Sequence, residues 1–96
     1  MRFEWDERKN ESNIEKHDID FNDAVLIFSS PMRVIPDTRY EYGEDRSIGF
    51  GLLDNRVVVV AFAEPEDDVV RVISIRRALT HEQKHYERYL KQLFGN

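Results

Sequence analysis

The chain of 96 residues contains no cysteine, which excludes both a disulfide framework and a thiolate metal site. It also has no apolar run near the roughly 20 residues that a membrane-spanning helix requires. The opening segment, Met1-Arg2-Phe3-Glu4-Trp5-Asp6, does not show the pattern of a signal peptide. We therefore expect a cytoplasmic protein of one domain, residues 1–96, with no membrane contact.

Positive charge is scarce overall but is concentrated near the carboxyl end, and the net charge is −5. Residues 1–68 hold 8 Lys and Arg against 17 Asp and Glu, whereas residues 69–96 hold 6 against 2. The balance therefore changes from −9 to +4 along the chain. This asymmetry permits local anion binding by the last third of the chain and argues against a strong general attraction to polyanions.

The segment from Val69 to Ala78 organises the rest, because a β-branched run ends there in two adjacent arginines, Arg76 and Arg77. A strand rich in Val and Ile is usually covered on both faces, which predicts a place near the middle of a sheet. The guanidinium groups at its end need water, a carboxylate or a phosphate. The pattern is typical of a charged site on a rigid support, and it also fits a strand end with solvated arginines.

Capping, turn and strand signals predict the other elements. Asp6 is a good N-cap for a helix over residues 7–17, and a second, short helix begins near Asp20. The expected strands are residues 3–5, 32–35, 46–53, 56–63 and 69–78, the last three forming an antiparallel meander. Residues 37–45 show almost no burial pattern and are predicted to form a mobile loop.

The predicted helix over residues 7–17 sorts its side chains into two groups. At 100° per residue, an arc of about a third of a turn carries Lys9, Asn13, Lys16 and His17. The opposite side carries Glu7, Glu11, Glu15 and Asp18. This segregation favours a different neighbour on each side of the helix, although a solvated helix sorted by chance gives the same pattern.

A third helix is predicted after Ala78, with Thr80 as its N-cap and Gln83 reaching back to complete a capping box. The apolar stripe predicted to pack against the sheet consists of Tyr86, Tyr89, Leu90, Leu93 and Phe94. Glu82 lies in the same stripe. Because a carboxylate on a buried face needs a cationic partner, we expect Glu82 to pair with Arg76 or Arg77.

Three separated motifs resemble the signatures of the BrnT toxin family. The first is Phe3-Glu4-Trp5-Asp6-Glu7-Arg8-Lys9 with Asn13, Lys16, His17 and Phe21. The second is Asp45-Arg46 with Gly49, and the third is Val70-Arg71-Val72-Ile73-Ser74-Ile75-Arg76-Arg77-Ala78 with Glu82 and Tyr86. The chain departs from the family pattern at Ile75, where a small residue, typically Ala, is usual. This larger side chain either crowds the site or repacks beside it.

The resemblance implies an α+β protein with the RelE-like ribonuclease fold, in which two N-terminal helices and one C-terminal helix surround a small antiparallel sheet. It also implies the toxin of a type II toxin–antitoxin system, a metal-independent RNA endonuclease that inhibits translation. The implied partners are the RNA substrate and a ribbon-helix-helix antitoxin (BrnA-like), with operator DNA bound only through that antitoxin. We expect no cofactor and no metal.

Metal-free RNA cleavage requires activation of the 2′-hydroxyl, stabilisation of the phosphorane charge and protonation of the 5′-oxygen. The candidates for stabilising the charge are Arg46 and Arg76, because a guanidinium binds two phosphate oxygens at once. The candidates for proton transfer are Lys9, Lys16 and His17, with histidine favoured by an ordinary pKa near neutrality. Glu82 is expected to orient an arginine or to act as base, and the predicted RNA contacts are Asn13 and Arg77.

Two alternatives to this assignment come from other classes of protein. A two-metal nuclease is less favoured, because the acidic residues lack a convergent ligand pattern once they are placed on elements. A non-catalytic binding module of the same fold, acting through its antitoxin, is favoured by the net negative charge and by Ile75.

Overall fold

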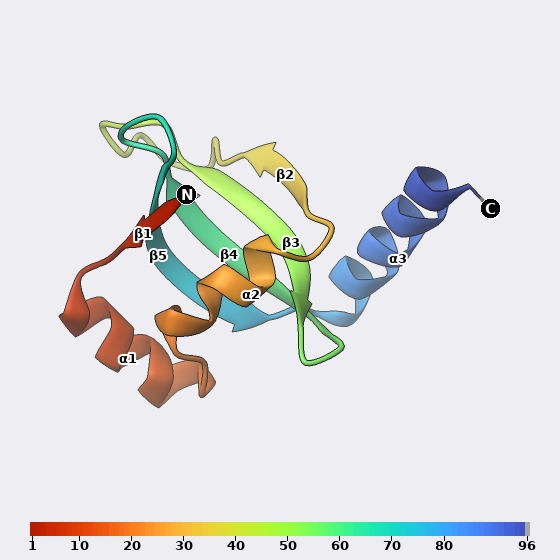
Figure 1. Ribbon diagram of the computed structural model, residues 1–96, viewed down its shortest axis with the longest axis horizontal. Coiled ribbons are helices and arrows are strands. Elements are labelled where there is room, and N and C mark those ends of the chain that lie inside the picture. Colours follow the sequence, from red (N-terminus) through yellow and green to blue (C-terminus); the bar gives the residue numbers. More distant parts are fainter. Residues whose placement is uncertain (96) are drawn as a thin grey trace.

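The computed structural model describes residues 1–95, which form one five-stranded sheet with helices around it (Figure 1). The elements, in chain order, are β1 (Arg2–Glu4), α1 (Glu7–His17), the 3-10 turn η1 (Phe21–Asp23), α2 (Ala24–Phe28), β2 (Arg33–Pro36), β3 (Ser47–Leu53), β4 (Arg56–Ala63), β5 (Val69–Arg77) and α3 (Thr80–Phe94). The strand order is β1-β5-β4-β3-β2. The predicted meander is confirmed as β3, β4 and β5.

The predicted antiparallel sheet is in fact mixed, because β1 lies parallel to β5. Residues 5–68 separate these two strands, so a parallel arrangement needs no tight turn. β5 has a paired neighbour on each side, which agrees with its predicted position inside the sheet. However, β1 pairs only with residues 69–71, so the rest of that edge of β5 needs other partners for its backbone groups.

A β-bulge in β5 decides which side chains face the functional side of the sheet. Ser74 pairs with Ala61 on β4, but the next pair joins Val72 to Phe62, so Ile73 is the extra residue. Beyond the bulge, side chains alternate between faces. Ser74 and Arg76 therefore share one face of the sheet, and the residue between them occupies the other.

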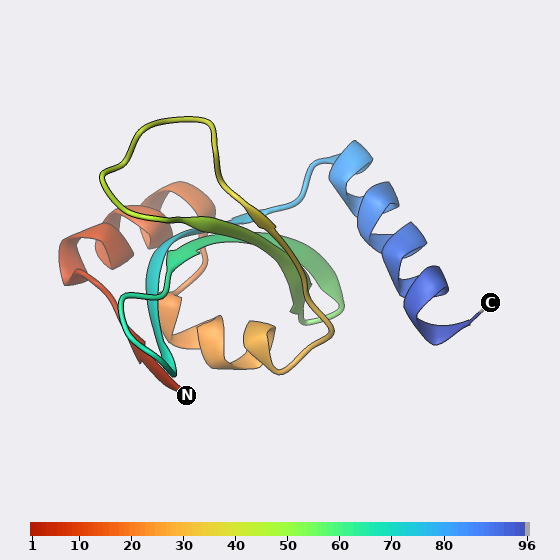
Figure 2. The ribbon, with the colours of Figure 1, turned by 90° about the horizontal axis from the view of Figure 1, so that it is seen from above.

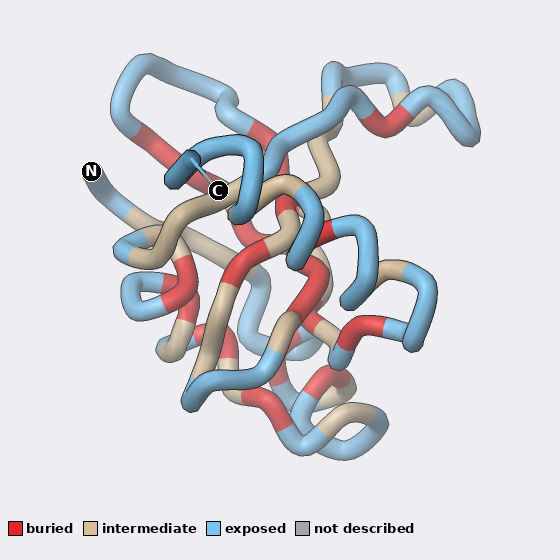
Figure 3. The backbone as a smooth tube through the Cα atoms, turned by 90° about the vertical axis from the view of Figure 1, so that its right-hand side faces the viewer, coloured by how far each residue is buried: buried red, intermediate tan, exposed pale blue. Residues whose placement is uncertain are grey.

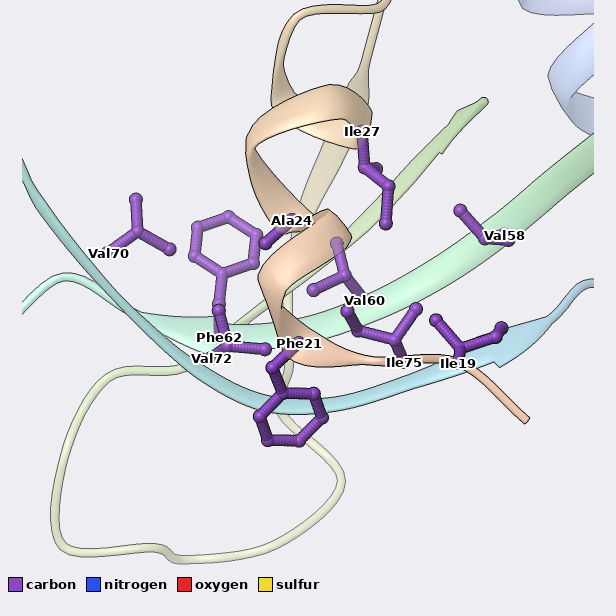
Figure 4. Packing of buried hydrophobic residues seen from close by; sticks show 10 residues of the cluster. All are labelled: Ile19, Phe21, Ala24, Ile27, Val58, Val60, Phe62, Val70, Val72 and Ile75. Atoms are coloured by element: carbon purple, nitrogen blue, oxygen red, sulfur yellow. The ribbon is translucent and has the colours of Figure 1, made fainter. Parts of the chain in front are cut away.

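The core lies between the sheet and the segment that contains η1 and α2. Figure 4 shows its ten buried residues, which are Ile19, Phe21, Ala24, Ile27, Val58, Val60, Phe62, Val70, Val72 and Ile75. The sheet curves around α2, whereas residues 37–46 arc over the opposite face (Figure 2). Gly51 permits the close approach of α2, because a Cβ at this position would lie 3.0 Å from Cγ2 of Ile27.

Local signals explain where several elements begin and turn. The Asp6 carboxylate accepts a hydrogen bond of 2.8 Å from the backbone N–H of Arg8, as expected of the N-cap of α1. Asp54 and Asn55 adopt φ values of 51° and 62°, which confirms the hairpin turn between β3 and β4. The predicted capping box of α3 was placed one residue too late, because the N-cap is Leu79 and its backbone N–H donates to Glu82 rather than to Gln83.

The C-terminal helix α3 packs against the rest of the chain through its first three turns and not at its end. The Tyr86 side chain is buried and donates a hydrogen bond of 2.6 Å to the Pro31 carbonyl. The Tyr89 hydroxyl, one turn later, donates a hydrogen bond of 3.1 Å to the Met32 carbonyl. The end of α3 projects away from the sheet (Figure 1), and its exposed course is visible in Figure 3. Leu93 and Phe94 are 52% and 70% exposed, so the prediction that the whole apolar stripe packs on the sheet is wrong at its end.

Candidate active site

A depression on the face of the sheet opposite α2 brings together side chains from three strands, a loop and a helix. Its lining residues are Arg39, Ile48, Val59, Ala61, Ser74, Arg76 and Glu82, around a volume of about 260 Å³. Valine, isoleucine and alanine side chains from β3 and β4 form an apolar floor, and charged groups stand at the rim. A guanidinium over such a floor binds an anion more strongly than it would in open water, because the local dielectric constant is lower.

Arg76 and Glu82 form a bidentate ion pair in this depression, which confirms the predicted partner of Glu82. Nη1 and Nη2 of Arg76 donate hydrogen bonds of 2.8 and 2.9 Å to the two carboxylate oxygens. The Glu82 carboxylate also accepts a bond of 2.8 Å from the backbone N–H of Leu79. The hydrogen bonds from Arg76 lower the pKa of Glu82 and those to Glu82 raise the pKa of Arg76, so both groups stay charged at neutral pH.

Arg39 is the second arginine of the depression, and no motif in the sequence indicated it. Its Nε and Nη2 donate hydrogen bonds of 2.9 and 3.0 Å to the carboxylate of Asp37. The Asp37 side chain is only 2% exposed and also accepts a hydrogen bond from the Tyr42 hydroxyl. The hydrogen bonds from Arg39 contribute most to lowering the pKa of Asp37 to about 2.

The segment predicted to be a mobile loop, residues 37–45, is therefore organised around a buried carboxylate. It contains no helix or strand, in agreement with the prediction. The backbone N–H of Asp37 donates a hydrogen bond of 2.8 Å to the Arg46 carbonyl, which ties the two ends of the segment together. Whether the segment moves stays a prediction, but its hydrogen bonds give Arg39 a defined position.

A second, more open depression adjoins the first at Arg76. Its lining residues are Lys16, His17, Arg76, Arg77 and Leu79. The carboxyl end of α1 thus lies beside the end of β5, and three of the predicted proton-transfer and charge-stabilising residues come together there. Lys9 is exposed two turns earlier on α1, about 10 Å along the helix axis from Lys16, and it lines neither depression in the described part of the chain.

Arg46, the other candidate for stabilising the phosphorane charge, lies apart from Arg76, so the two arginines do not line one cleft. The Arg46 guanidinium stacks over the Tyr42 ring at 4.1 Å, and its Nε donates a hydrogen bond of 3.0 Å to Glu44. Glu44 also binds Arg71, which places this cluster at the opposite end of β5. Arg71 and Arg76 are five residues apart, about 15 Å along a strand.

Asn13 is buried, and its side chain is occupied by the protein backbone. Its Nδ2 donates hydrogen bonds of 2.9 Å to the carbonyls of Ile19 and Ile75, and its Oδ1 accepts one of 3.0 Å from the backbone N–H of Ile75. The amide side chain thus pairs with β5 where β1 no longer does. This geometry conflicts with the prediction that Asn13 contacts RNA, and it makes Asn13 a residue that holds the strand carrying Arg76.

Ile75 does not crowd the candidate site. The side chain is fully buried in the core on the α2 face, beside Val60 and Ile19 (Figure 4). Because Ser74 and Arg76 lie on the other face, the larger residue changes the packing of the core rather than the shape of the depression. The departure from the family pattern therefore gives no support to a non-catalytic protein.

No group of three or more His, Asp or Glu side chains within residues 1–95 is arranged to hold a metal ion. None of the helices described in this range is long and apolar enough to cross a membrane.

The chain shares its sequence pattern and its fold with a known toxin family. The family described as "Ribonuclease toxin, BrnT, of type II toxin-antitoxin system" matches residues 5–82. The crystal structure of the Brucella abortus ribonuclease toxin, BrnT, is similar, with a TM-score of 0.69 and 32% sequence identity. This similarity covers 83% of the present chain and 99% of the Brucella chain. A comparison with curated protein sequences gives no match.

The family match ends at Glu82, so it includes both arginine–carboxylate pairs of the depression and leaves most of α3 outside. The structural similarity confirms the predicted α+β, RelE-like architecture. With a family match over most of its length and a solved relative that agrees in fold, the chain belongs to the BrnT family of ribonuclease toxins of type II toxin–antitoxin systems.

Proposed function

We propose that this protein cleaves RNA endonucleolytically and without a metal ion, with Arg76 stabilising the charge that develops on the scissile phosphate. The observation that carries the proposal is the bidentate Arg76–Glu82 pair at the junction of two depressions. A guanidinium held in place before the substrate arrives does not have to be reorganised in the transition state. Arg76 also retains N–H groups beyond those that Glu82 accepts, so it is able to bind a phosphate without leaving its partner.

Glu82 acts as the orienting group rather than as the base in this proposal. Both of its carboxylate oxygens accept hydrogen bonds, and these lower its pKa. A carboxylate with a lowered pKa is a weak proton acceptor. Proton transfer is therefore assigned to His17 or Lys16, which line the adjoining depression with Arg76, and Arg77 is assigned to RNA binding there.

The net charge of the chain and its family membership indicate which macromolecules it binds. Type II systems pair a toxin with an antitoxin, and we propose a ribbon-helix-helix antitoxin (BrnA-like) that neutralises this protein in the cytoplasm. The exposed carboxylates of Glu7, Glu11 and Glu15 on α1 offer a basic partner one landing surface. With a net charge of −5, the chain is expected to reach operator DNA through its antitoxin rather than alone.

Expression of the intact chain and of Arg76→Ala from an inducible promoter in bacteria tests the proposal. Arg8→Ala is the matched control, because Arg8 is exposed on α1 and forms no ion pair within residues 1–95. We expect the intact chain and Arg8→Ala to arrest growth, inhibit translation and fragment cellular RNA, and Arg76→Ala to do none of these. Growth arrest without RNA fragments, or full toxicity of a stably expressed Arg76→Ala chain, contradicts the proposal.

A further inference from the structure

We propose that Arg39 is a second phosphate-binding residue of the same site and forms, with Arg76, a clamp of two guanidinium groups around one RNA phosphate. This inference rests on the proposed ribonuclease function and deepens it. It makes residues 37–44, which lie outside the sequence signatures, part of the functional site.

The two arginines lie at one site. Arg39 and Arg76 line the same depression, although one comes from the segment after β2 and the other from the end of β5. They lie close enough that the positive charge of Arg39 opposes the rise in the pKa of Arg76. Two like charges over an apolar floor repel each other, and an anion between them removes that repulsion.

Both guanidinium groups are held in place before a ligand binds. Each guanidinium is held by a bidentate carboxylate, Asp37 for Arg39 and Glu82 for Arg76. The backbone N–H of Arg39 also donates to Asp37, which fixes the main chain as well as the side chain. Arg39 is nevertheless 63% exposed at its side chain, so its head remains accessible to a ligand.

The remaining hydrogen-bond donors match a phosphate. A guanidinium has five N–H groups. Arg39 uses one at Nε and one at Nη2, whereas Arg76 uses two at Nη1, one of them to the Arg77 carbonyl, and one at Nη2. Both arginines therefore keep free donors at the rim of the depression. Because each charge is balanced by a carboxylate, the clamp selects a phosphate by placed donors rather than by long-range attraction, which suits a chain of net charge −5.

A purely structural role for Arg39, as the partner of buried Asp37, makes a different prediction. Arg39→Ala would then leave an uncompensated carboxylate and lower the melting temperature. The double variant Asp37→Asn/Arg39→Ala removes that carboxylate charge, so it should recover stability. Under the clamp it should still bind RNA weakly, whereas under the structural role binding should recover with stability.

The experiment measures binding of a single-stranded 2′-O-methyl RNA oligonucleotide, which lacks the attacking hydroxyl, by fluorescence anisotropy at several salt concentrations. The variants are Arg39→Ala, the Asp37→Asn/Arg39→Ala double variant, and Arg8→Ala as the control arginine. Cleavage of the corresponding unmodified RNA is measured in parallel, with Arg76→Ala as the reference for a lost phosphate contact.

We expect both Arg39 variants to bind about 10- to 100-fold more weakly, the scale of a lost charge-assisted phosphate contact. The slope of log affinity against log salt should fall by about 0.7, the value for one phosphate contact on a single strand. Arg8→Ala should bind like the intact chain. Loss of binding in Arg39→Ala with full recovery in the double variant overturns the clamp.

Failure of the clamp and failure of the proposed function give different results. If Arg39→Ala binds and cleaves RNA like the intact chain while Arg76→Ala does not cleave, the clamp is overturned and the ribonuclease function stands. If the intact chain cleaves no RNA, the proposed function fails and the clamp is judged by binding alone. Weaker binding by both Arg39 variants then supports it, and equal binding overturns it.

Discussion

The amide of Asn13 should contribute a large share of the stability of this protein, and its replacement by alanine tests how α1 is held against β5. Asn13 is 5% exposed and Ile75 is fully buried. Asn13→Ala removes three hydrogen bonds and leaves the carbonyls of Ile19 and Ile75 and the N–H of Ile75 without those partners. A buried polar group left unpaired costs about 1–3 kcal/mol, so the two groups of Ile75 alone cost about 2–6 kcal/mol.

The expected change in melting temperature follows from that free energy. For a domain of about 100 residues, 1 kcal/mol corresponds to about 4–8 °C. We therefore expect Asn13→Ala to melt about 8 °C or more below the intact chain, measured by circular dichroism. Glu11→Ala is the control, because Glu11 is exposed on the same helix, and its melting temperature should change by only a few degrees.

A second variant separates the donors of Asn13 from its acceptor. Asn13→Asp keeps an oxygen that can accept from the Ile75 N–H. The new carboxylate lies against the two carbonyl oxygens to which the amide nitrogen donated, and this repulsion raises the pKa of the carboxyl group in the folded state. Its stability should therefore increase as the pH falls and the carboxylate takes up a proton. If Asn13→Ala melts like the intact chain but no longer binds RNA, the structural reasoning is refuted and the RNA-contact role returns.

Three further predictions concern the loop, the core and the last helix. The stability given by the lowered pKa of Asp37, about 2, is present above its ordinary pKa of 3.8 and is lost as the pH falls to 2. Urea unfolding should therefore show Asp37→Asn less stable than the intact chain by about 1–2 kcal/mol at pH 6, and the difference should close at pH 2. Gly51→Ala should lower the free energy of unfolding by about 1–3 kcal/mol, because the new Cβ would lie 3.0 Å from Cγ2 of Ile27. An unchanged melting temperature would mean that α2 shifts freely. Leu93→Gln and Phe94→Gln should each change stability by less than about 0.5 kcal/mol, and a larger loss would show that the end of α3 packs in solution.

Much of the fold was predictable because its signals are local. The Asp6 cap, the Asp54-Asn55 turn and the β-branched runs of β4 and β5 each determine a few neighbouring residues. The parallel pairing of β1 was not predictable in this way, since it depends on which edge of the sheet remains free. The projection of α3 also escaped prediction, because an apolar stripe shows that a helix can pack but not how far its partner extends.

Part of the candidate site was also predictable, because some of its signals are local. Arg76 and Glu82 were paired correctly, because a buried carboxylate near two arginines has few choices. Asn13 was misassigned because it shares a helical arc with Lys16 and His17, and a polar side chain that pairs with backbone has the same sequence pattern as one that faces a ligand. Arg39 gave no signal, because its position depends on the buried carboxylate of the loop and on the curvature of the sheet.

The most direct test of the central claim is the RNA cleavage rate of Arg76→Ala and of Arg76→Ala/Glu82→Ala, measured beside their melting temperatures. Arg76→Ala should cleave about 100- to 1000-fold more slowly, as expected for the loss of one preorganised charge donor. It should also melt lower, because the Glu82 side chain, 15% exposed, loses its partner. The double variant should regain part of the melting temperature and none of the cleavage. A double variant that regains both shows that Arg76 serves only to pair with Glu82, and full cleavage by Arg76→Ala contradicts the account outright.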